Sequence, residues 1–405
     1  MTQSQRHPIP NTPSVISSIA IITAMTIASA RYSARFPAGH LLHSTFVHNY
    51  DLGEELGSGG YGFVMTAYNR EHGYEVAVKF IIKSKISEHA WMEDATYGRL
   101  PTEVMLLSLV DHSNIVKCLD LYEDQFCFYL VQELHGSPWS KKEPVKTEPQ
   151  VPTRRDSRFS RVDSPSANAS LELSSDTPES SSQHLSAHSS NGNPLYHAQD
   201  SQSGQHDRNQ PAPNQLLHPP QFPRRPSHDL FECIEQTPGK RLSEEQACHV
   251  FAQIVDAVHY LDCQGITHRD IKDENLLIDK DLKVKLIDFG SAVIADPDEP
   301  RPYYTLFFGT IAYASSEILL KRPYQAPPAE VWTLGVLLSY ILTGMSPFPS
   351  QQDAIDGRII LAEIPGVQLS QACLDLMRRC LEPNPELRAD IAEVRWHPWM
   401  QPSSV

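Results

Sequence analysis

The chain has 405 residues, and 40% of them are hydrophobic, which allows one large domain or two modest ones. Its formal net charge of −15 gives no reason to expect general nucleic-acid binding. The seven cysteines are scattered, odd in number and without CxxC pairs, which favours reduced, mostly buried thiols in a cytosolic-type protein over a disulfide framework.

Residues 1–49 are distinct in composition from the rest of the chain. They contain no Asp or Glu, and an apolar stretch over 15–30 ends in Ala28-Ser29-Ala30, as in a transit peptide or a secretory signal. The stretch is too short and too rich in Ser and Thr to predict a stable membrane span. We expect a disordered or targeting-like extension on a cytoplasmic or nuclear protein. Mitochondrial targeting by residues 1–49 ranks second, and secretion ranks last.

The next motif is a glycine-rich segment that fits the pattern G-x-G-x-x-G-x-V, in which glycines let the backbone lie close to phosphate groups. The pattern alone also opens dinucleotide-binding units. Here Val76-Ala77-Val78-Lys79 follows on an alternating, strand-like run, which favours consecutive β-hairpins over a strand–loop–helix unit. The nucleotide-binding candidates of this region are Gly57, Ser58, Gly59, Gly60, Tyr61, Gly62, Val64, Ala77 and Lys79.

The apolar residues predict a helix over 102–110, and a carboxylate on it is the expected partner of Lys79 if the segment binds phosphate in the way proposed below. Glu103 is the first candidate, because Glu88 and Glu93 are separated from this helix by Gly98 and a proline. The alternative is that Glu103 is a solvated carboxylate on the helix surface.

Residues 130–136 then predict a buried strand that runs into a linker. A low-complexity segment over 137–226 follows, dense in Ser, Pro, Gln, Asn and His, and it cannot bury enough apolar surface to fold. We expect a disordered insert within one domain, since a long loop adds little closure entropy. Two arginine pairs precede Ser157 and Ser227, which are either autophosphorylation sites, part of a tethered pseudosubstrate, or residues of a plain spacer.

The most specific pattern is His268-Arg269-Asp270-Ile271-Lys272-Asp273-Glu274-Asn275, followed by an apolar strand over 284–287 and by Asp288-Phe289-Gly290. Phosphoryl transfer depends on positioning and charge neutralisation. In that chemistry Asp270 would orient an incoming hydroxyl, and Lys272 would neutralise the moving phosphoryl group. Asn275 and Asp288 would supply oxygen ligands to Mg²⁺, which prefers them.

Further motifs predict the supporting structure of the C-terminal part. Ser243 begins a helix as its capping residue, with Gln246 as the partner three residues on, and the apolar run over 331–342 predicts a buried helix. Ser315-Ser316-Glu317 stands in the place of an Ala-Pro-Glu motif and differs from it in the first two residues. We expect the Glu317 carboxylate to pair with Arg388. Glu330 occupies the acidic position of a D-x-W-x-x-G helix start.

Together these motifs resemble those of the protein kinases. The resemblance implies an α+β, bilobal protein kinase fold, with a small antiparallel β lobe carrying one helix (αC) and a large, mainly helical lobe. It divides the chain into a segment over 1–49, an N-lobe with hinge over 50–136, the insert over 137–226, a C-lobe over 227–400 and a tail over 401–405. It also places adenine at the hinge, where Gln132 would be the gatekeeper and Glu133, His135 and Asp229 would lie near the nucleotide.

The closer resemblance is to the kinase domain of the PAS kinase family, in the calmodulin-dependent-kinase-like group. The residues that carry it include Asp273, where many kinases have proline, Trp91-Met92-Glu93-Asp94, and Glu330. Only 49 residues precede Tyr50, too few for a domain of usual size, so the resemblance does not extend to a PAS sensor.

The expected activity is transfer of the ATP γ-phosphate to Ser or Thr of protein substrates, because Lys272 and Thr310 are typical of serine/threonine kinases. The resemblance suggests substrates with an upstream arginine, which Asp229 and Glu274 would recognise; Asp229 serves the ATP ribose in the alternative interpretation. Thr305 is the first candidate for phosphorylation in the activation segment. A pseudokinase or scaffold is the main rival function, and a small-molecule kinase is the second.

Overall fold

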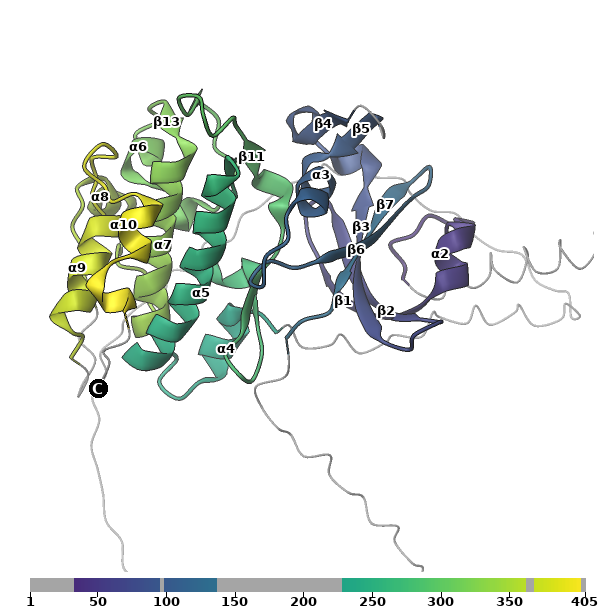
Figure 1. The fold of residues 1–405 in the computed structure, drawn as a ribbon, viewed down its shortest axis with the longest axis horizontal. Coiled ribbons are helices and arrows are strands. Elements are labelled where there is room, and N and C mark those ends of the chain that lie inside the picture. Colours follow the sequence, from purple (N-terminus) through teal and green to yellow (C-terminus); the bar gives the residue numbers. More distant parts are fainter. Residues whose placement is uncertain (1–32, 95–97, 137–227, 362–367, 402–405) are drawn as a thin grey trace, which may run out of the picture. The chain divides into compact units, whose positions relative to one another are not determined.

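The computed structural model describes residues 33–94, 98–136, 228–361 and 368–401 (Figure 1). The expectations for residues 1–32, for the inserted segment and for both of its serine sites fall outside these ranges. The described residues confirm the predicted α+β fold, with an antiparallel sheet in the first lobe and mainly helices in the second.

A five-stranded antiparallel sheet with the order β1-β2-β3-β7-β6 forms the first lobe. Its strands are β1 (Tyr50–Ser58), β2 (Gly62–Asn69), β3 (Glu75–Ile82), β6 (Cys118–Glu123) and β7 (Cys127–Glu133). The first three strands pair as consecutive hairpins, as the spacing of the glycine-rich segment predicted. The register places Val64 opposite Lys79, so the strand leaving the glycine-rich turn lies beside the lysine.

Both faces of this sheet are buried, because successive side chains of a strand point to opposite sides. On β3, Val76, Val78 and Phe80 are fully buried in one apolar cluster. Ile81 belongs to a second apolar cluster. That cluster also includes Leu130 of β7, residues of the helix over 102–109, and residues of the helical lobe. The sheet is therefore covered on its outer face as well as on the face toward the helical lobe.

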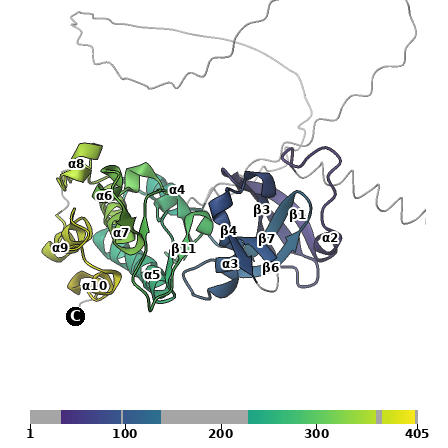
Figure 2. The same ribbon diagram turned by 90° about the horizontal axis from the view of Figure 1, so that it is seen from above.

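Residues 33–49 cover that outer face, which corrects the expectation that all of residues 1–49 form a disordered extension. They end in the short helix α2 (Ser44–Asn49). Figures 1 and 2 both place α2 on the side of the sheet opposite to the helix α3 (Thr102–Leu109). Phe36 and Phe46 are buried within the outer apolar cluster. Burial of two large aromatic side chains orders this stretch in spite of its unremarkable composition.

A β-hairpin precedes α3, in the place where the sequence contains helix breakers. It consists of β4 (Trp91–Asp94) and β5 (Gly98–Pro101). The Arg99 guanidinium lies over the Trp91 ring at 4.9 Å, a cation–π contact that holds the two strands together. The helix that carries Glu103 is consequently short, and the two short 3₁₀ turns before the hairpin (Lys83–Lys85 and Glu88–Ala90) are separate from it.

The second lobe is mainly helical. Its helices are α4 (Leu230–Gln236), α5 (Glu244–Cys263), α6 (Ser316–Leu319), α7 (Ala326–Thr343), α8 (Gln351–Ile355), α9 (Gln371–Cys380) and α10 (Ile391–Arg395). The predicted capping box of Ser243 and Gln246 is present at the start of α5. The predicted buried helix is α7, which ends where Gly344 adopts a left-handed backbone conformation with φ of 72°.

Short strand pairs link the helices of this lobe and carry the motif residues. They are β8 (Ile266–Thr267) with β11 (Val293–Ile294), β9 (Leu276–Ile278) with β10 (Val284–Leu286), and β12 (Tyr303–Tyr304) with β13 (Tyr324–Gln325). The eight-residue motif around Asp270 therefore lies between β8 and β9. Within the described part of the chain, no helix is both long and apolar enough to cross a membrane.

Candidate active site

A cavity of about 480 Å³ contains the nucleotide-binding candidates of both lobes. The predicted residues that line it are Gly57, Ser58, Gly59, Gly60, Tyr61, Gly62, Val64, Ala77, Lys79, Glu103, Gln132, Glu133, His135, Asp229, Lys272, Asn275 and Asp288. Sequence reasoning missed the apolar residues Leu56, Val116, Leu277 and Ile287, which also line it. Leu277 had a usable signal, because it lies two residues after Asn275 in the most specific motif.

Glycine is required where the glycine-rich turn returns to the sheet. A side chain at Gly62 would place its Cβ 1.9 Å from the carbonyl oxygen of Phe80 on the neighbouring strand. No atom lies within 4 Å of the positions that Cβ atoms of Gly59 and Gly60 would occupy. A side chain at either Gly59 or Gly60 would therefore meet no neighbour, whereas the base of the turn lies close to β3.

Lys79 joins the two lobes through two carboxylates. Its Nζ lies 2.5 Å from Oε1 of Glu103 on α3 and 2.9 Å from Oδ1 of Asp288. Burial alone would lower the pKa of Lys79, but the charges of Asp288 and Glu103 outweigh it and raise that pKa. The same ammonium lowers the pKa of Asp288 to about 2. The lysine is therefore a cation and Asp288 an anion at neutral pH, as binding of phosphate and a metal ion requires.

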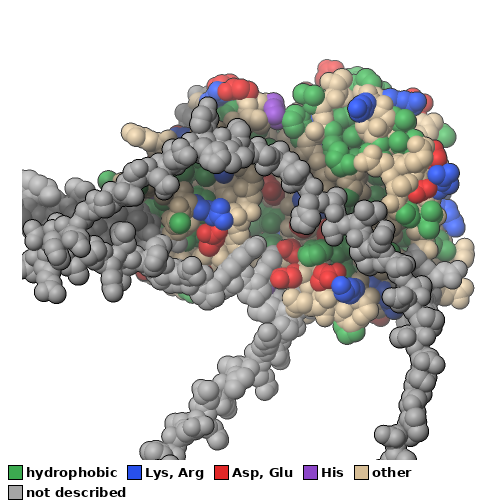
Figure 3. Space-filling view, turned by 180° about the vertical axis from the view of Figure 1, so that it is seen from behind, with side chains coloured by type: hydrophobic (Ala, Val, Ile, Leu, Met, Phe, Trp, Pro, Cys, Tyr) green, Lys and Arg blue, Asp and Glu red, His purple; other side chains and the backbone are tan. Residues whose placement is uncertain are grey.

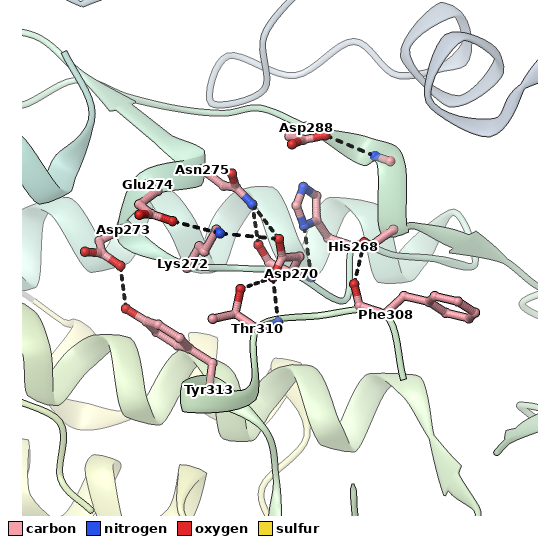
Figure 4. Close-up of polar contacts among 12 residues, drawn as sticks. His268, Asp270, Lys272, Asp273, Glu274, Asn275, Asp288, Phe308, Thr310 and Tyr313 are labelled. Atoms are coloured by element: carbon pink, nitrogen blue, oxygen red, sulfur yellow. Dashed lines mark hydrogen bonds and ion pairs between the residues drawn. The ribbon is translucent and has the colours of Figure 1, made fainter. Parts of the chain in front are cut away.

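The catalytic-loop candidate Asp270 is fixed by hydrogen bonds on both carboxylate oxygens (Figure 4). Its Oδ1 accepts from the backbone N–H of Thr310 at 3.0 Å and from the Thr310 hydroxyl at 2.8 Å. Its Oδ2 accepts from Nδ2 of Asn275 at 3.0 Å. Thr310 was singled out in the sequence for its substrate class, whereas its contact with Asp270 spans 40 residues and was not foreseen.

Lys272 lies beside the same carboxylate and also contacts an exposed acid. Its Nζ lies 3.8 Å from Oδ2 of Asp270 and 2.8 Å from Oε2 of Glu274. Asp273, in contrast, is 7% exposed and accepts a hydrogen bond from the hydroxyl of Tyr313 at 2.5 Å (Figure 4). Burial raises the pKa of Asp273 in spite of this hydrogen bond. Asp273 thus connects the catalytic loop with the segment that follows Thr310.

The backbone of the loop is held by Glu330 at the N-terminal part of α7. Its Oε2 accepts from the backbone N–H of Arg269 at 2.6 Å, so the longer side chain at this motif position reaches the loop. Arg269 needs this support because its φ is 65°, which is unfavourable for a residue with a side chain. Burial raises the pKa of Glu330 to about 7.

The Arg269 side chain is engaged by the activation segment. Its Nε donates to the carbonyl oxygen of Ser291 at 2.6 Å, and its guanidinium lies 5.3 Å from the Tyr304 ring and 5.4 Å from the Phe308 ring. Thr305, the predicted phosphorylation site, is exposed. The Arg269 side chain also forms a hydrogen bond with the hydroxyl of Tyr324, so a carbonyl group, aromatic rings and a phenol all contact it.

At the hinge, the predicted residues line the cavity, and the side chains of two of them contact the strand pair β9–β10 and its turn. The Glu133 carboxylate lies 2.6 Å from Nζ of Lys285 on β10, and Nε2 of His135 lies 2.9 Å from the carbonyl oxygen of Lys283. Asp229 caps α4 by accepting from the backbone N–H of Glu232 at 2.8 Å. Gln132 is 6% exposed and lines the cavity, and its role as gatekeeper stays a prediction.

The oxygen donors of Asn275 and Asp288 fit a divalent metal ion that is shared with phosphate groups. Nδ2 of Asn275 donates to Asp270, which leaves the side-chain oxygen of Asn275 as an acceptor for the metal ion. The backbone of Asn275 is held separately, because its carbonyl oxygen accepts from the backbone N–H of Ile287 at 3.0 Å. Among the described residues, no cluster of three or more His, Cys, Asp or Glu side chains could hold a metal ion. An ion at this site would therefore take further ligands from the nucleotide and water, as Mg²⁺ does in phosphoryl-transfer sites.

The predicted structural ion pair is present behind the activation segment. Nη1 and Nη2 of Arg388 donate to the two carboxylate oxygens of Glu317, each at 2.9 Å, and the guanidinium is fully buried. The replacement of Ala-Pro by Ser315-Ser316 leaves this pair intact, and Ser316 donates to the carbonyl oxygen of Pro383 at 2.7 Å.

Comparisons with known proteins agree with this geometry. The profile of the protein kinase domain matches residues 50–143 and 223–400, on both sides of the predicted insert. A PAS domain-containing serine/threonine-protein kinase of Mus musculus is 32% identical over 353 residues, which are 87% of this chain and 18% of that protein. Sperm motility kinase 2B of Mus musculus is 30% identical over 89% of this chain and 53% of its own length. Serine/threonine-protein kinase PSK2 of Saccharomyces cerevisiae is 26% identical over 85% of this chain and 23% of its own length.

The chain thus spans between about a fifth and a half of these relatives' lengths. The match of the domain profile covers more than half of the chain, and it includes every residue that lines the cavity described above. The chain belongs to the protein kinase family.

Proposed function

We propose that the protein is an ATP-dependent serine/threonine kinase that transfers the γ-phosphate to protein substrates. The observation that carries the proposal is the position of Lys79 Nζ between Glu103 and Asp288, because it assembles the nucleotide-binding parts of both lobes. Two of the three relatives named above are serine/threonine kinases by name, and this chain covers only part of each of the three.

Each of the chain's own groups has a role in the proposed reaction. Lys79 would bind the α- and β-phosphates, while Asp270, fixed by Thr310 and Asn275, would orient the substrate hydroxyl toward the γ-phosphorus. Lys272, 3.8 Å from Asp270, would neutralise the charge that develops on the transferred group. Asn275 and Asp288 would hold Mg²⁺, which supplies charge neutralisation when it is bound.

Exposed apolar side chains of the activation segment favour a protein substrate over a small molecule. Tyr303, Leu306 and Ile311 of the activation segment are 68%, 64% and 53% exposed. Figure 3 shows apolar side chains gathered on the helical lobe, at the upper right of that view. Large exposed apolar side chains are typical of protein-interaction sites, which a small-molecule kinase would not need on its activation segment.

The proposed substrate preference is an arginine upstream of the target residue. Asp229 and Glu274 both line the cavity, and Glu274 is 60% exposed in its side chain. A guanidinium can pair with a carboxylate in a bidentate manner, which gives this recognition its direction. The contact of Glu274 with Lys272 at 2.8 Å means that a substrate arginine would have to share or displace that lysine.

Radiolabel transfer from ATP to an arginine-containing peptide library tests the proposal. The wild-type chain should phosphorylate Ser and Thr peptides in the presence of Mg²⁺, and Asp270→Asn should reduce the rate by at least about 100-fold. Glu274→Gln should reduce transfer to peptides with an upstream arginine more than transfer to peptides without one. A wild-type chain that binds ATP without transferring phosphate would instead support the scaffold function.

A cytoplasmic or nuclear location remains part of this proposal, since the substrate ATP and the reduced cysteines are typical of those compartments. A fluorescent reporter fused to residues 1–49 tests it directly. Diffuse signal supports the proposal, and signal confined to mitochondria would overturn it.

A further inference from the structure

Residues 33–49 join the outer apolar cluster of the first lobe, and their aromatic side chains determine where they lie. The Phe36 ring meets the rings of Phe63 and Phe80 edge-on, at centroid distances of 5.0 and 5.1 Å. The Phe46 ring stacks on Tyr129 at 5.2 Å. Phe63 belongs to the strand that leaves the glycine-rich turn, so this contact joins the N-terminal segment directly to the phosphate-binding region.

Polar contacts anchor the same segment at two distant points of the sheet. At the turn between β6 and β7, Nε2 of His40 lies 2.8 Å from Oδ2 of Asp124. At the other side, Nε of Arg35 lies 2.8 Å from Oε1 of Glu55, and its Nη2 donates to the Ser58 hydroxyl at 2.8 Å. The segment therefore runs across the sheet from the β6–β7 turn to the glycine-rich turn.

The attachment at Ser58 reaches the end of β1, where the strand enters the glycine-rich turn. β1 loses its regular register between Leu52 and Glu55 and again between Glu55 and Gly57, just where Arg35 binds. Within the turn, the backbone N–H of Gly59 donates to the carbonyl oxygen of Gly62 at 3.0 Å, and the backbone N–H of Ile82 donates to the carbonyl oxygen of Tyr61 at 2.9 Å. Glycine-rich backbone has high conformational entropy, so a side-chain contact from outside the turn adds to these bonds in restricting its position.

We propose that Arg35 is a positioning residue for nucleotide binding, which holds the β1 end of the glycine-rich turn over the cavity through Glu55 and Ser58. Arg35 does not line the cavity, so its effect on the nucleotide is indirect. The inference rests on the proposed kinase function, because the glycine-rich turn is taken to cover the ATP phosphates. It predicts an effect on the affinity for ATP and none on the affinity for the peptide substrate.

Arg35→Ala in the full chain tests this role, with Arg70→Ala as the matched control. Arg70 lies on the same sheet and pairs with Asp51 near the opposite end of β1, and the two arginine side chains are 49% and 45% exposed. Exposed ion pairs are weak, so Arg35→Ala should raise both the Kd and the KM for ATP about three- to five-fold. The KM for peptide and the melting temperature should stay close to those of the wild type, and Arg70→Ala should change neither ATP constant.

Glu55→Ala provides a second, independent test through a double-mutant cycle, because Glu55 binds Arg35 and does not line the cavity. If Arg35 acts through Glu55, the double variant should bind ATP about as well as Arg35→Ala alone, because both changes remove the same contact. Fully additive losses of ATP affinity would overturn the proposal. So would an unchanged Kd for ATP in Arg35→Ala, or an equal loss in Arg70→Ala.

Direct titration of ATP separates this inference from the proposed function. A wild-type chain that binds ATP but phosphorylates no peptide would refute the kinase proposal, while the Kd values of the variants would still decide the role of Arg35.

Discussion

Replacing Glu330 by glutamine removes a buried negative charge while keeping an oxygen that can accept the backbone N–H of Arg269. Glu330 is 4% exposed, and its carboxylate lies 2.6 Å from that nitrogen. Burial raises its pKa from 4.5 to about 7, although the N–H groups of Arg269 and His268 favour the charged form. The substitution therefore tests how much the folded protein loses by keeping a carboxylate at this position.

The raised pKa implies a stability that falls with pH. Between pH 4.5 and 7 the unfolded chain has ionised Glu330 while the folded chain still holds the proton, so raising the pH favours unfolding. The contribution of the protonated Glu330 side chain to the unfolding free energy is fully present below pH 4.5, and it is lost as the pH rises through about 7. Each pKa unit corresponds to about 1.4 kcal/mol, so the loss amounts to roughly 3 kcal/mol.

Urea denaturation of the wild type and of Glu330→Gln between pH 4.5 and 8 measures this effect. The difference in unfolding free energy between the two proteins should move by roughly 3 kcal/mol in favour of the variant as the pH rises, while all other titrating groups cancel. Glu386→Gln, at an exposed carboxylate of the same lobe, controls for the loss of one negative charge. A difference that stays constant over this pH range would refute the reasoning.

Three further predictions concern other contacts of the site. Arg388→Met leaves the buried carboxylate of Glu317 without its partner and should lower the unfolding free energy by about 3–5 kcal/mol in urea denaturation; a loss below about 1 kcal/mol would contradict this. Tyr313→Phe removes the hydrogen bond to Asp273 and should raise the KM for peptide roughly ten-fold without changing the KM for ATP, in steady-state kinetics. Chelation by EDTA should abolish phosphoryl transfer and added MgCl₂ should restore it; transfer that persists in EDTA would argue against the metal-binding role of Asp288.

The choice of Glu103 as the partner of Lys79 shows what can be predicted when local signals are strong. Gly98 interrupts the chain before the helix, and the structure has a β-hairpin there, which leaves Glu93 on a strand and Glu103 on α3. The ion pair at 2.5 Å follows from that arrangement. The prediction worked because helix breakers act on the residues next to them.

Residues 33–49 show the opposite case. Their composition favoured a disordered extension, and the helix at their end has only six residues, too few for a periodic pattern to be recognised. The available signal was the pair of aromatic residues, Phe36 and Phe46, which needed a partner surface. That surface consists of alternate residues on strands that begin only at Tyr50, so it exists only after the sheet has formed.

The sequence by itself determined the family, the two lobes and the identity of the phosphate-binding and metal-binding candidates. These depend on residue types at short, definite spacings, such as the eight residues from His268 to Asn275. Only the tertiary structure decided which groups hold them in place: Thr310 on Asp270, Tyr313 on Asp273, and Arg35 at the glycine-rich turn. Such contacts join segments that are 23 to 40 residues apart, and their geometry depends on how the whole chain packs rather than on any local pattern.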